Sequence, residues 1–153
     1  MKKLIILTAI PGAGKTTWAL NHQKNNPNTF IVSSDEIRLE LFGEYQNLSN
    51  EKLVWQRFKE KPHEYAEKYD EVTVILDAIN GYNKYRIEDF LRYPEFDKAY
   101  LVYLKTPLEK ALIQNKMRPK ERWIPDEAII KYYNSFEEPD DEVKKVCEVI
   151  IVE

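Results

Sequence analysis

The sequence of 153 residues predicts an α/β fold, a parallel five-stranded sheet flanked by helices and carrying a helical lid. Five short runs rich in branched apolar residues have the length of strands. Three of them are almost continuously hydrophobic, which is typical of parallel strands buried on both faces. The intervals between them are long enough for crossover helices. The predicted strands are Leu4–Ala9, Thr29–Ser33, Val72–Asp77, Ala99–Leu104 and Val146–Val152.

Helical signals occupy the intervals between the predicted strands. The segment Thr106–Glu109 has the pattern of a capping box with proline at the first helical position. Pro125, followed by Asp126 and Glu127, begins another helix, whose apolar residues recur at helical spacing and are predicted to contact the core. The polar stretch 43–70 predicts one or two surface helices. The predicted core contacts of the second helix are Ile129, Ile130, Tyr133 and Phe136.

Composition and charge limit the class of protein. With 43% hydrophobic and 32% charged residues, the chain has the composition of a soluble globular protein. It contains no apolar run of roughly 18 residues that could cross a membrane, and the N-terminus lacks the cleavage site of a signal peptide. The single cysteine, Cys147, cannot form an intrachain disulfide. These observations predict a single domain, residues 1–153, located in the cytoplasm without a membrane partner.

The most informative segment is Ala9–Thr17, AIPGAGKTT, which lies between the first predicted strand and a helix. Glycines there let backbone N–H groups surround phosphate oxygens, and the helix N-terminus adds positive potential. This is the pattern of a P-loop, so ATP and Mg²⁺ are the predicted cofactors. Ala9 replaces the first glycine of the pattern, which is tolerated if its φ is negative. The predicted nucleotide-binding residues are Gly12, Ala13, Gly14, Lys15, Thr16 and Thr17, with Thr16 as the metal ligand.

Acidic residues follow two of the predicted strands. The segment Asp77–Asn80, DAIN, follows the third strand, where a GTPase would carry Asp-x-x-Gly, and no Asn-Lys-x-Asp guanine motif occurs. Asp77 is followed by alanine, where hydrolytic ATPases usually place a glutamate, which favours transfer to a substrate over hydrolysis. Asp35 follows the second strand. Because ligands bind at the carboxyl ends of the strands, Asp35 is a candidate general base and Arg38 a candidate ligand for an acceptor's phosphate.

A basic segment, Lys116–Arg122, lies between the two predicted helices. Pro119 disfavours continuation of either helix, so the segment is predicted to be a mobile lid. Kinases of this size close an arginine-bearing segment over the nucleotide, and such an arginine can raise the rate by about 10³–10⁵.

These features together resemble the kinase domain of phage-type and bacterial polynucleotide 5′-hydroxyl kinases, along most of the chain. The resemblance implies that the α/β sheet is P-loop kinase-like. It also implies ATP-dependent transfer of the γ-phosphate to the 5′-hydroxyl of DNA or RNA, with a nucleic-acid 5′ end as the partner. The residues that carry it are the opening Met1–Thr8, the loop with Thr17–Ala19, the Asp35–Arg38 spacing, Asp77–Asn80 and the lid leading into Ile124 and Pro125.

The resemblance also implies a role for each candidate residue. Lys15 and Thr16 would bind ATP and magnesium, and Asp35 would be the general base. Arg118 would stabilise the transferring phosphoryl group, and Arg122 would be a second lid arginine. The implied catalytic set is Lys15, Asp35, Arg38 and Arg118, the implied substrate set is Asp35, Arg38, Asp77 and Asn80, and the implied lid contacts to the nucleotide are Arg118 and Arg122.

Two alternatives stay open at this point. Relatives of this group include kinases for small metabolites and nucleotide sugars with much the same motifs, and a nucleotide-dependent regulatory ATPase is a third possibility. Gln114 stands where polynucleotide kinases often begin the lid with arginine. A polynucleotide would need aromatic stacking platforms, although each candidate is more commonly a packing residue. The candidates are Trp18, Trp55, Tyr82, Tyr85 and Trp123.

Overall fold

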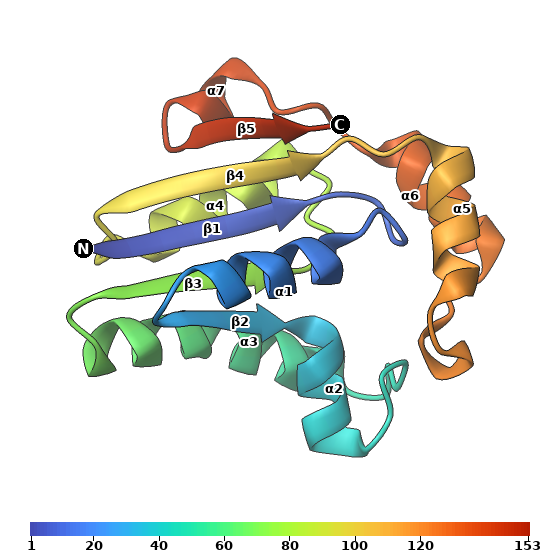
Figure 1. Ribbon diagram of the computed structural model, residues 1–153, viewed down its shortest axis with the longest axis horizontal. Helices are drawn as coiled ribbons and strands as arrows, with labels where there is room; N and C mark the ends of the chain where they lie inside the picture. Colours follow the sequence, from blue (N-terminus) through green and yellow to red (C-terminus); the bar gives the residue numbers. More distant parts are fainter.

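The computed structural model describes residues 1–153 and confirms the predicted fold class (Figure 1). Five strands form one sheet in the order β2-β3-β1-β4-β5, and every neighbouring pair is parallel. Two strands have the predicted bounds, and the other three differ slightly at their ends. The strands are β1 (Lys2–Thr8), β2 (Thr29–Ser33), β3 (Val72–Asp77), β4 (Lys98–Leu104) and β5 (Glu148–Val152).

Helices cover both faces of the sheet. Helix α1 lies on the face turned toward the viewer in Figure 1, and α3 and α4 lie on the opposite face. Helices α2, α5 and α6 lie beyond the carboxyl ends of the strands. The helices are α1 (Lys15–Asn25), α2 (Ser34–Phe42), α3 (Glu51–Lys68), α4 (Asn83–Arg92), α5 (Leu108–Met117), the 3-10 turn η1 (Lys120–Arg122), α6 (Asp126–Ser135) and α7 (Asp141–Lys144).

None of these helices combines the length and the apolar character that a membrane span requires.

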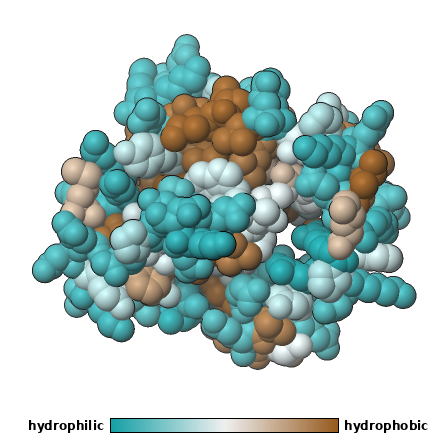
Figure 2. Space-filling model, viewed as in Figure 1, coloured by the Kyte–Doolittle hydropathy of each residue, from teal (hydrophilic) through white to brown (hydrophobic).

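Each strand divides its side chains between two hydrophobic cores. In β1, Leu4 and Ile6 join the core under α3 and α4, while Ile5 and Leu7 join the core under α1. Both sets are buried, which explains why residues 4–7 of the strand are all hydrophobic. The α1 face is less completely covered at β4 and β5. Figure 2 shows a hydrophobic surface there, and Ile150 of β5 is 41% exposed.

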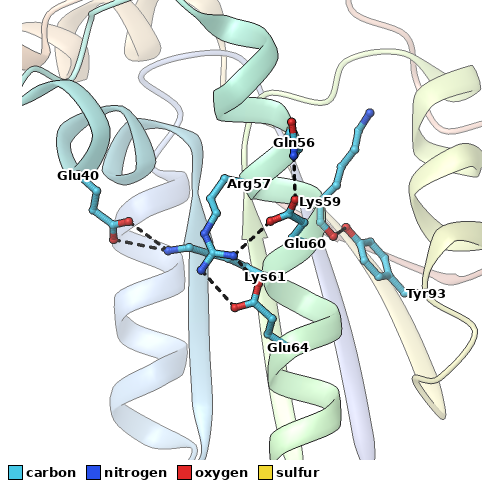
Figure 3. Close-up of polar contacts among 8 residues, drawn as sticks. All are labelled: Glu40, Gln56, Arg57, Lys59, Glu60, Lys61, Glu64 and Tyr93. Atoms are coloured by element: carbon cyan, nitrogen blue, oxygen red, sulfur yellow. Dashed lines mark hydrogen bonds and ion pairs between the residues drawn. The ribbon is translucent and has the colours of Figure 1, made fainter.

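The stretch 43–70 forms a loop and one long helix, α3. Asn50 caps the helix by accepting a hydrogen bond from the backbone N–H of Leu53 at 3.2 Å. The outer side of α3 carries an ion-pair network in which Arg57 pairs with two glutamates of the same helix (Figure 3). The inner side packs against the sheet through residues spaced by four, which are Val54, Phe58, Pro62 and Ala66.

The predicted capping box at Thr106 is wrong. Helix α5 begins at Leu108 with Pro107 as its N-cap, and no side chain caps it. The hydroxyl of Thr106 instead donates to the carbonyl oxygen of Ala13 at 3.2 Å. Thr106 therefore fastens the segment after β4 to the loop after β1, a contact that local sequence spacing could not reveal.

The predicted core face of α6 is correct only in part. Ile129 is fully buried, and Phe136, just beyond the helix, packs against the same core. Ile130 and Tyr133 are 39% and 47% exposed. Because α6 lies at the edge of the molecule (Figure 1), it buries a narrower face than its apolar pattern indicates.

Candidate active site

A cleft of about 1110 Å³ lies where the strands end. Its volume exceeds the usual 300–1,000 Å³ of a small-molecule pocket, so it has room for more than a nucleotide. Among the predicted site residues, Ala13 alone does not line the cleft, because its methyl group packs in the core under α1. The predicted residues that line it are Gly12, Gly14, Lys15, Thr16, Thr17, Asp35, Arg38, Asp77, Asn80, Arg118 and Arg122.

The loop between β1 and α1 has the backbone of a phosphate cradle. Gly12 and Gly14 have φ values of +84° and +95°, a region that other residues rarely adopt. Alanine can replace the first glycine of the pattern at position 9 because Ala9 has a negative φ. The N–H of Ala9 donates to the carbonyl oxygen of Ile79 at 3.2 Å, and its side chain is fully buried. Alanine therefore fits this position without strain.

Lys15, at the start of α1, and the buried Asp77, at the end of β3, carry opposite charges in the same cleft. The ammonium group of Lys15 donates to the carbonyl oxygen of Ile10 at 3.3 Å. Burial lowers the pKa of Lys15, and the nearby carboxylates of Asp77 and Asp35 act in the opposite direction. Burial raises the pKa of Asp77, and Lys15 and a hydrogen bond from Thr16 oppose this rise. The two charges thus compensate each other inside the cleft.

Thr16 and Asp77 offer oxygen ligands of the kind that magnesium prefers. The hydroxyl of Thr16 donates to Oδ2 of Asp77 at 3.1 Å, so the two oxygens already lie together. Mg²⁺ usually keeps several waters and takes one or two carboxylates together with substrate phosphates. No cluster of three or more His, Cys, Asp or Glu side chains exists that could hold a metal by itself. This sparse donor set fits magnesium that binds together with a nucleotide.

Asp35 and Arg38 lie on the first turns of α2, beside the P-loop. Nη1 of Arg38 donates to Oδ1 of Asp35 at 3.0 Å. The rest of the guanidinium is held by Glu51, the first residue of α3, through Nε to Oε2 at 3.0 Å and Nη2 to Oε1 at 2.5 Å. Arg38 is 8% exposed, and its guanidinium carbon lies 5.9 Å from the ring centre of Trp55. Contacts with Asp35, Glu51 and Trp55 therefore orient Arg38, the residue predicted to bind a phosphate of the acceptor.

The lid segment is anchored by Asn115, a fully buried residue of α5. Its Oδ1 accepts hydrogen bonds from Nε and Nη2 of Arg118 at 3.1 and 2.7 Å. The same side chain bonds both the N–H and the carbonyl oxygen of Ile124, at 3.1 and 2.7 Å. Asn115 thus joins the two ends of the lid and fixes the position of Arg118.

The second lid arginine, Arg122, lies close to Asp35, the candidate general base. Its Nη2 is 3.6 Å from Oδ2 of Asp35, and its guanidinium carbon is 4.6 Å from the ring centre of Tyr45. Its Nε is buried and has no hydrogen-bond partner. The lid therefore reaches across the cleft to α2 and to the loop before α3.

A buried arginine fixes the loop that carries Asn80. The carbonyl oxygen of Asn80 accepts hydrogen bonds from the hydroxyl of Thr8 at 2.6 Å and from Nε of Arg86 at 3.0 Å. Nη2 of Arg86 also donates to the hydroxyl of Thr8 at 2.9 Å. Asn80 adopts a positive φ of +46°, and its side chain donates to Asp89 at 3.3 Å. The wall after β3 is thereby tied to the strand that leads into the P-loop.

Sequence reasoning missed three residues that hold the site together: Glu51, Asn115 and Arg86. Each belongs to a residue type that is mostly exposed, and each contacts partners that are distant in the sequence or in a separate segment. Arg86 alone carried a usable signal, because it occupies a buried position in α4 together with Phe90, four residues later.

Comparisons with known proteins support the same fold. An L-seryl-tRNA(Sec) kinase of Methanococcus maripaludis is 31% identical over 147 residues, which is 89% of this chain. The chain spans only about half, 53%, of the length of that relative. A chain in the structure of the Pnkp1/Rnl/Hen1 RNA repair complex superposes with a TM-score of 0.75 at 23% identity, covering 88% of this chain and 43% of the other.

A second solved structure agrees, namely Chaetomium thermophilum Kti12 in complex with ADP-AlF3. It gives a TM-score of 0.67 at 16% identity over 97% of this chain and 88% of that one. These matches establish the P-loop kinase fold, with which the resemblance to polynucleotide kinases is consistent. The family described as chromatin associated protein KTI12 matches residues 2–146. Because this match extends over almost the whole sequence, the chain belongs to the KTI12 family.

Proposed function

We propose that this protein transfers the γ-phosphoryl group of ATP to a hydroxyl group carried by a nucleic acid, with the 5′-hydroxyl of a DNA or RNA end as the acceptor. The observation that carries the proposal is that Asp35 lines the same cleft as Lys15 and Thr16 of the P-loop. A phosphate cradle alone serves many nucleotide-binding proteins. A carboxylate beside it supplies the base that phosphorylation of a hydroxyl needs, and a regulatory switch needs no such base.

In the proposed reaction, Asp35 accepts the proton of the acceptor hydroxyl while the hydroxyl oxygen forms a bond to the γ-phosphorus. The bond between the γ-phosphorus and the oxygen that bridges it to the β-phosphorus breaks, and ADP leaves. A positioned base of this kind contributes about 10²–10⁴ in rate. The hydrogen bond from Arg38 fixes the Asp35 carboxylate and leaves Oδ2 on the side of the lid.

The nucleotide would be held by the P-loop backbone and by Lys15, whose ammonium has a carbonyl oxygen as its one hydrogen-bond partner. Thr16 and Asp77 would hold Mg²⁺, which supplies neutralisation of charge on the phosphate oxygens when it is bound. Arg118, oriented by Asn115, would contact the transferring phosphoryl group. Each of these side chains lines the cleft or fixes one that does.

A second candidate acceptor is the seryl hydroxyl of an aminoacylated tRNA. The relative that is 31% identical is named as a kinase of L-seryl-tRNA(Sec), and this supports an acceptor hydroxyl carried by RNA. Both candidates use the same base and the same P-loop. They differ in whether the phosphorylated hydroxyl belongs to a ribose end or to an amino acid.

The test is transfer of label from γ-labelled ATP, with magnesium, to a panel of acceptors. The panel contains 5′-hydroxyl DNA and RNA oligonucleotides, seryl-tRNA, mononucleotides and small sugars. Label on an oligonucleotide end supports the proposal, and label on seryl-tRNA supports the second candidate. Label on small molecules alone would place the protein among metabolite kinases, and ATP binding without any transfer would favour the regulatory alternative.

Two variants with matched controls tie the activity to this cleft. Lys15→Ala is expected to abolish most transfer, whereas Lys24→Ala, an exposed lysine near the end of the same helix, should not. Asp35→Asn keeps the shape of the side chain and should lower transfer by about 10²–10⁴ while ATP binding stays nearly unchanged. The neighbouring exposed Glu36→Gln is its control. Near-normal transfer by Asp35→Asn would exclude Asp35 as the base.

A further inference from the structure

Two exposed aromatic rings line the same cleft as the proposed base. Tyr82 and Tyr85 are 41% and 52% exposed, and both line the cleft that contains the P-loop and Asp35. Their rings meet edge to face with centres 6.1 Å apart. Neither ring enters a hydrophobic core cluster. Large apolar side chains exposed together in a cleft are a sign of ligand binding rather than of packing.

Hydrogen bonds of Asn83 fix the turn that carries Tyr82 and Tyr85. Tyr82 is the N-cap of α4. The side chain of the next residue, Asn83, accepts a hydrogen bond from Nη1 of the buried Arg86 at 2.6 Å. The backbone N–H of Asn83 donates to Glu137 at 2.8 Å, and its side chain donates to the carbonyl oxygen of Glu138 at 2.9 Å. The rings are therefore exposed but their backbone is fixed, so little ordering remains to be done when a flat ligand binds.

Basic groups accompany the rings. The ammonium of Lys84 lies 5.8 Å from the ring centre of Tyr85. Lys59 of α3 forms no ion pair, and Figure 3 shows its side chain extending away from the glutamate network of that helix. On the acidic side, Asp89 is neutralised by Arg92, whose Nη1 is 2.5 Å from it, which leaves Glu88 as the unpaired acid of this wall. Of these unpaired charges, Lys59 and Glu88 line the cleft, so this wall is not strongly basic.

We propose that Tyr82 and Tyr85 form a stacking site for a nucleobase of the acceptor strand, so that the acceptor is a single-stranded nucleic acid that extends beyond its reacting end. This inference rests on the proposed function and names the substrate class of the same cleft. Base stacking on aromatic rings tolerates any sequence, because every base has a π-face. It also explains why the cleft is larger than a nucleotide requires, and why its outer wall is aromatic instead of strongly basic.

The experiment uses single-stranded DNA oligonucleotides with a 5′-hydroxyl and the fluorescent base 2-aminopurine at the first, second or third position. Stacking on a ring quenches this base, and binding can be followed without ATP or turnover. The wild-type protein should quench one of the three probes. The double variant Tyr82→Ala/Tyr85→Ala should lose that quenching and bind the oligonucleotide about 5- to 150-fold more weakly, the range that one stacked base provides.

Two controls separate stacking from folding. Tyr82→Phe/Tyr85→Phe retains both rings and should quench and bind like the wild type. Tyr133→Ala removes a tyrosine of similar exposure, 47%, that lies outside this cleft, and should change nothing. Unchanged quenching and affinity in the double alanine variant would overturn the inference, and so would loss of both in the phenylalanine variant.

Transfer assays keep this outcome distinct from failure of the proposed function. With a 5′-hydroxyl oligonucleotide as the acceptor, the double alanine variant should raise KM more than it lowers kcat. An unchanged KM for the oligonucleotide would overturn the stacking site and leave the kinase proposal standing. Absence of label on every acceptor in the wild type would overturn the kinase proposal, whatever the probes show.

Discussion

Replacing Gly12 by alanine places a methyl group where the structure has backbone of α5. A Cβ built at this position lies 2.3 Å from the carbonyl oxygen of Ala111, and ordinary contact begins at 3.4 Å, so the two segments must separate by about 1.1 Å. The φ of +84° adds about 1–2 kcal/mol of backbone strain for any residue with a Cβ. Helix α5 carries Asn115 and leads into Arg118. The displacement therefore moves the lid relative to the P-loop.

A displacement of about 1 Å can cost about 10²-fold in rate, so Gly12→Ala should lower kcat by that order and lower the free energy of unfolding by more than the strain alone. Denaturant unfolding and label transfer measure the two effects. Gly43→Ala is the matched control, because Gly43 has a φ of +76° and open space around its Cβ position. It should lose about 1–2 kcal/mol of stability and keep its activity.

Gly14→Ala completes the comparison within the P-loop itself. Gly14 has a φ of +95°, but its nearest neighbour, Oε1 of Gln114, is 3.9 Å from the Cβ position. It tests the effect of strain in the cradle without the clash against α5. If Gly12→Ala matched Gly43→Ala in both stability and kcat, the argument that this glycine is required by the close approach of α5 would be refuted.

Two further changes test residues that hold the site, and a third tests a buried phenol of the core. Glu51→Gln weakens the charge-assisted pair with Arg38 and should lower kcat/KM about tenfold without changing ATP affinity; unchanged kinetics would mean that the pair does not orient Arg38. Asn115→Ala removes the side chain that holds Arg118, so Arg118 is no longer positioned at the cleft. This variant should lower kcat more than it weakens ATP binding. An equal effect on kcat and on ATP affinity would contradict a specific role of Asn115 in the lid. Burial raises the pKa of Tyr93 to about 12, whereas the unfolded phenol loses its proton near pH 10. Stability should therefore fall between about pH 10 and pH 12, by up to about 2.7 kcal/mol, and Tyr93→Phe should remove this part of the alkaline loss in unfolding measured across pH.

The sheet and the P-loop could be predicted because their signals are local. Thr29–Ser33 and Val72–Asp77 are strands with the predicted bounds. Short apolar runs of this length, rich in branched residues, are typical of buried strands. The P-loop could be predicted for the same reason, because its glycines, its lysine and its threonine all lie within the short segment Ala9–Thr17. Asp35 and Asp77 were found as acids that follow buried strands, and the sheet order places their strands side by side.

The errors arose where a local pattern had a competing use. Thr106 has the spacing of a helix cap, but its hydroxyl binds the P-loop carbonyl of Ala13, and the helix starts later. Ile130 and Tyr133 have the spacing of a core face, but α6 lies at the edge of the molecule, where both side chains stay exposed. In each case the segment has the predicted secondary structure, and tertiary context decided what the side chains contact.

Arg38 shows why the remaining part of the site could not be predicted. Its place after β2 indicated a ligand for an acceptor phosphate, yet its main partner is Glu51, which is 13 residues away across the loop before α3. A carboxylate in two-point contact with a guanidinium occupies the geometry that a phosphate would use. An acceptor phosphate must then bind the remaining N–H groups of Arg38 or displace Glu51, so the orientation of Arg38 is set before any acceptor arrives. The side chains proposed to carry out chemistry follow the ends of strands and can be found locally, whereas those that orient them are brought together only by the folded chain.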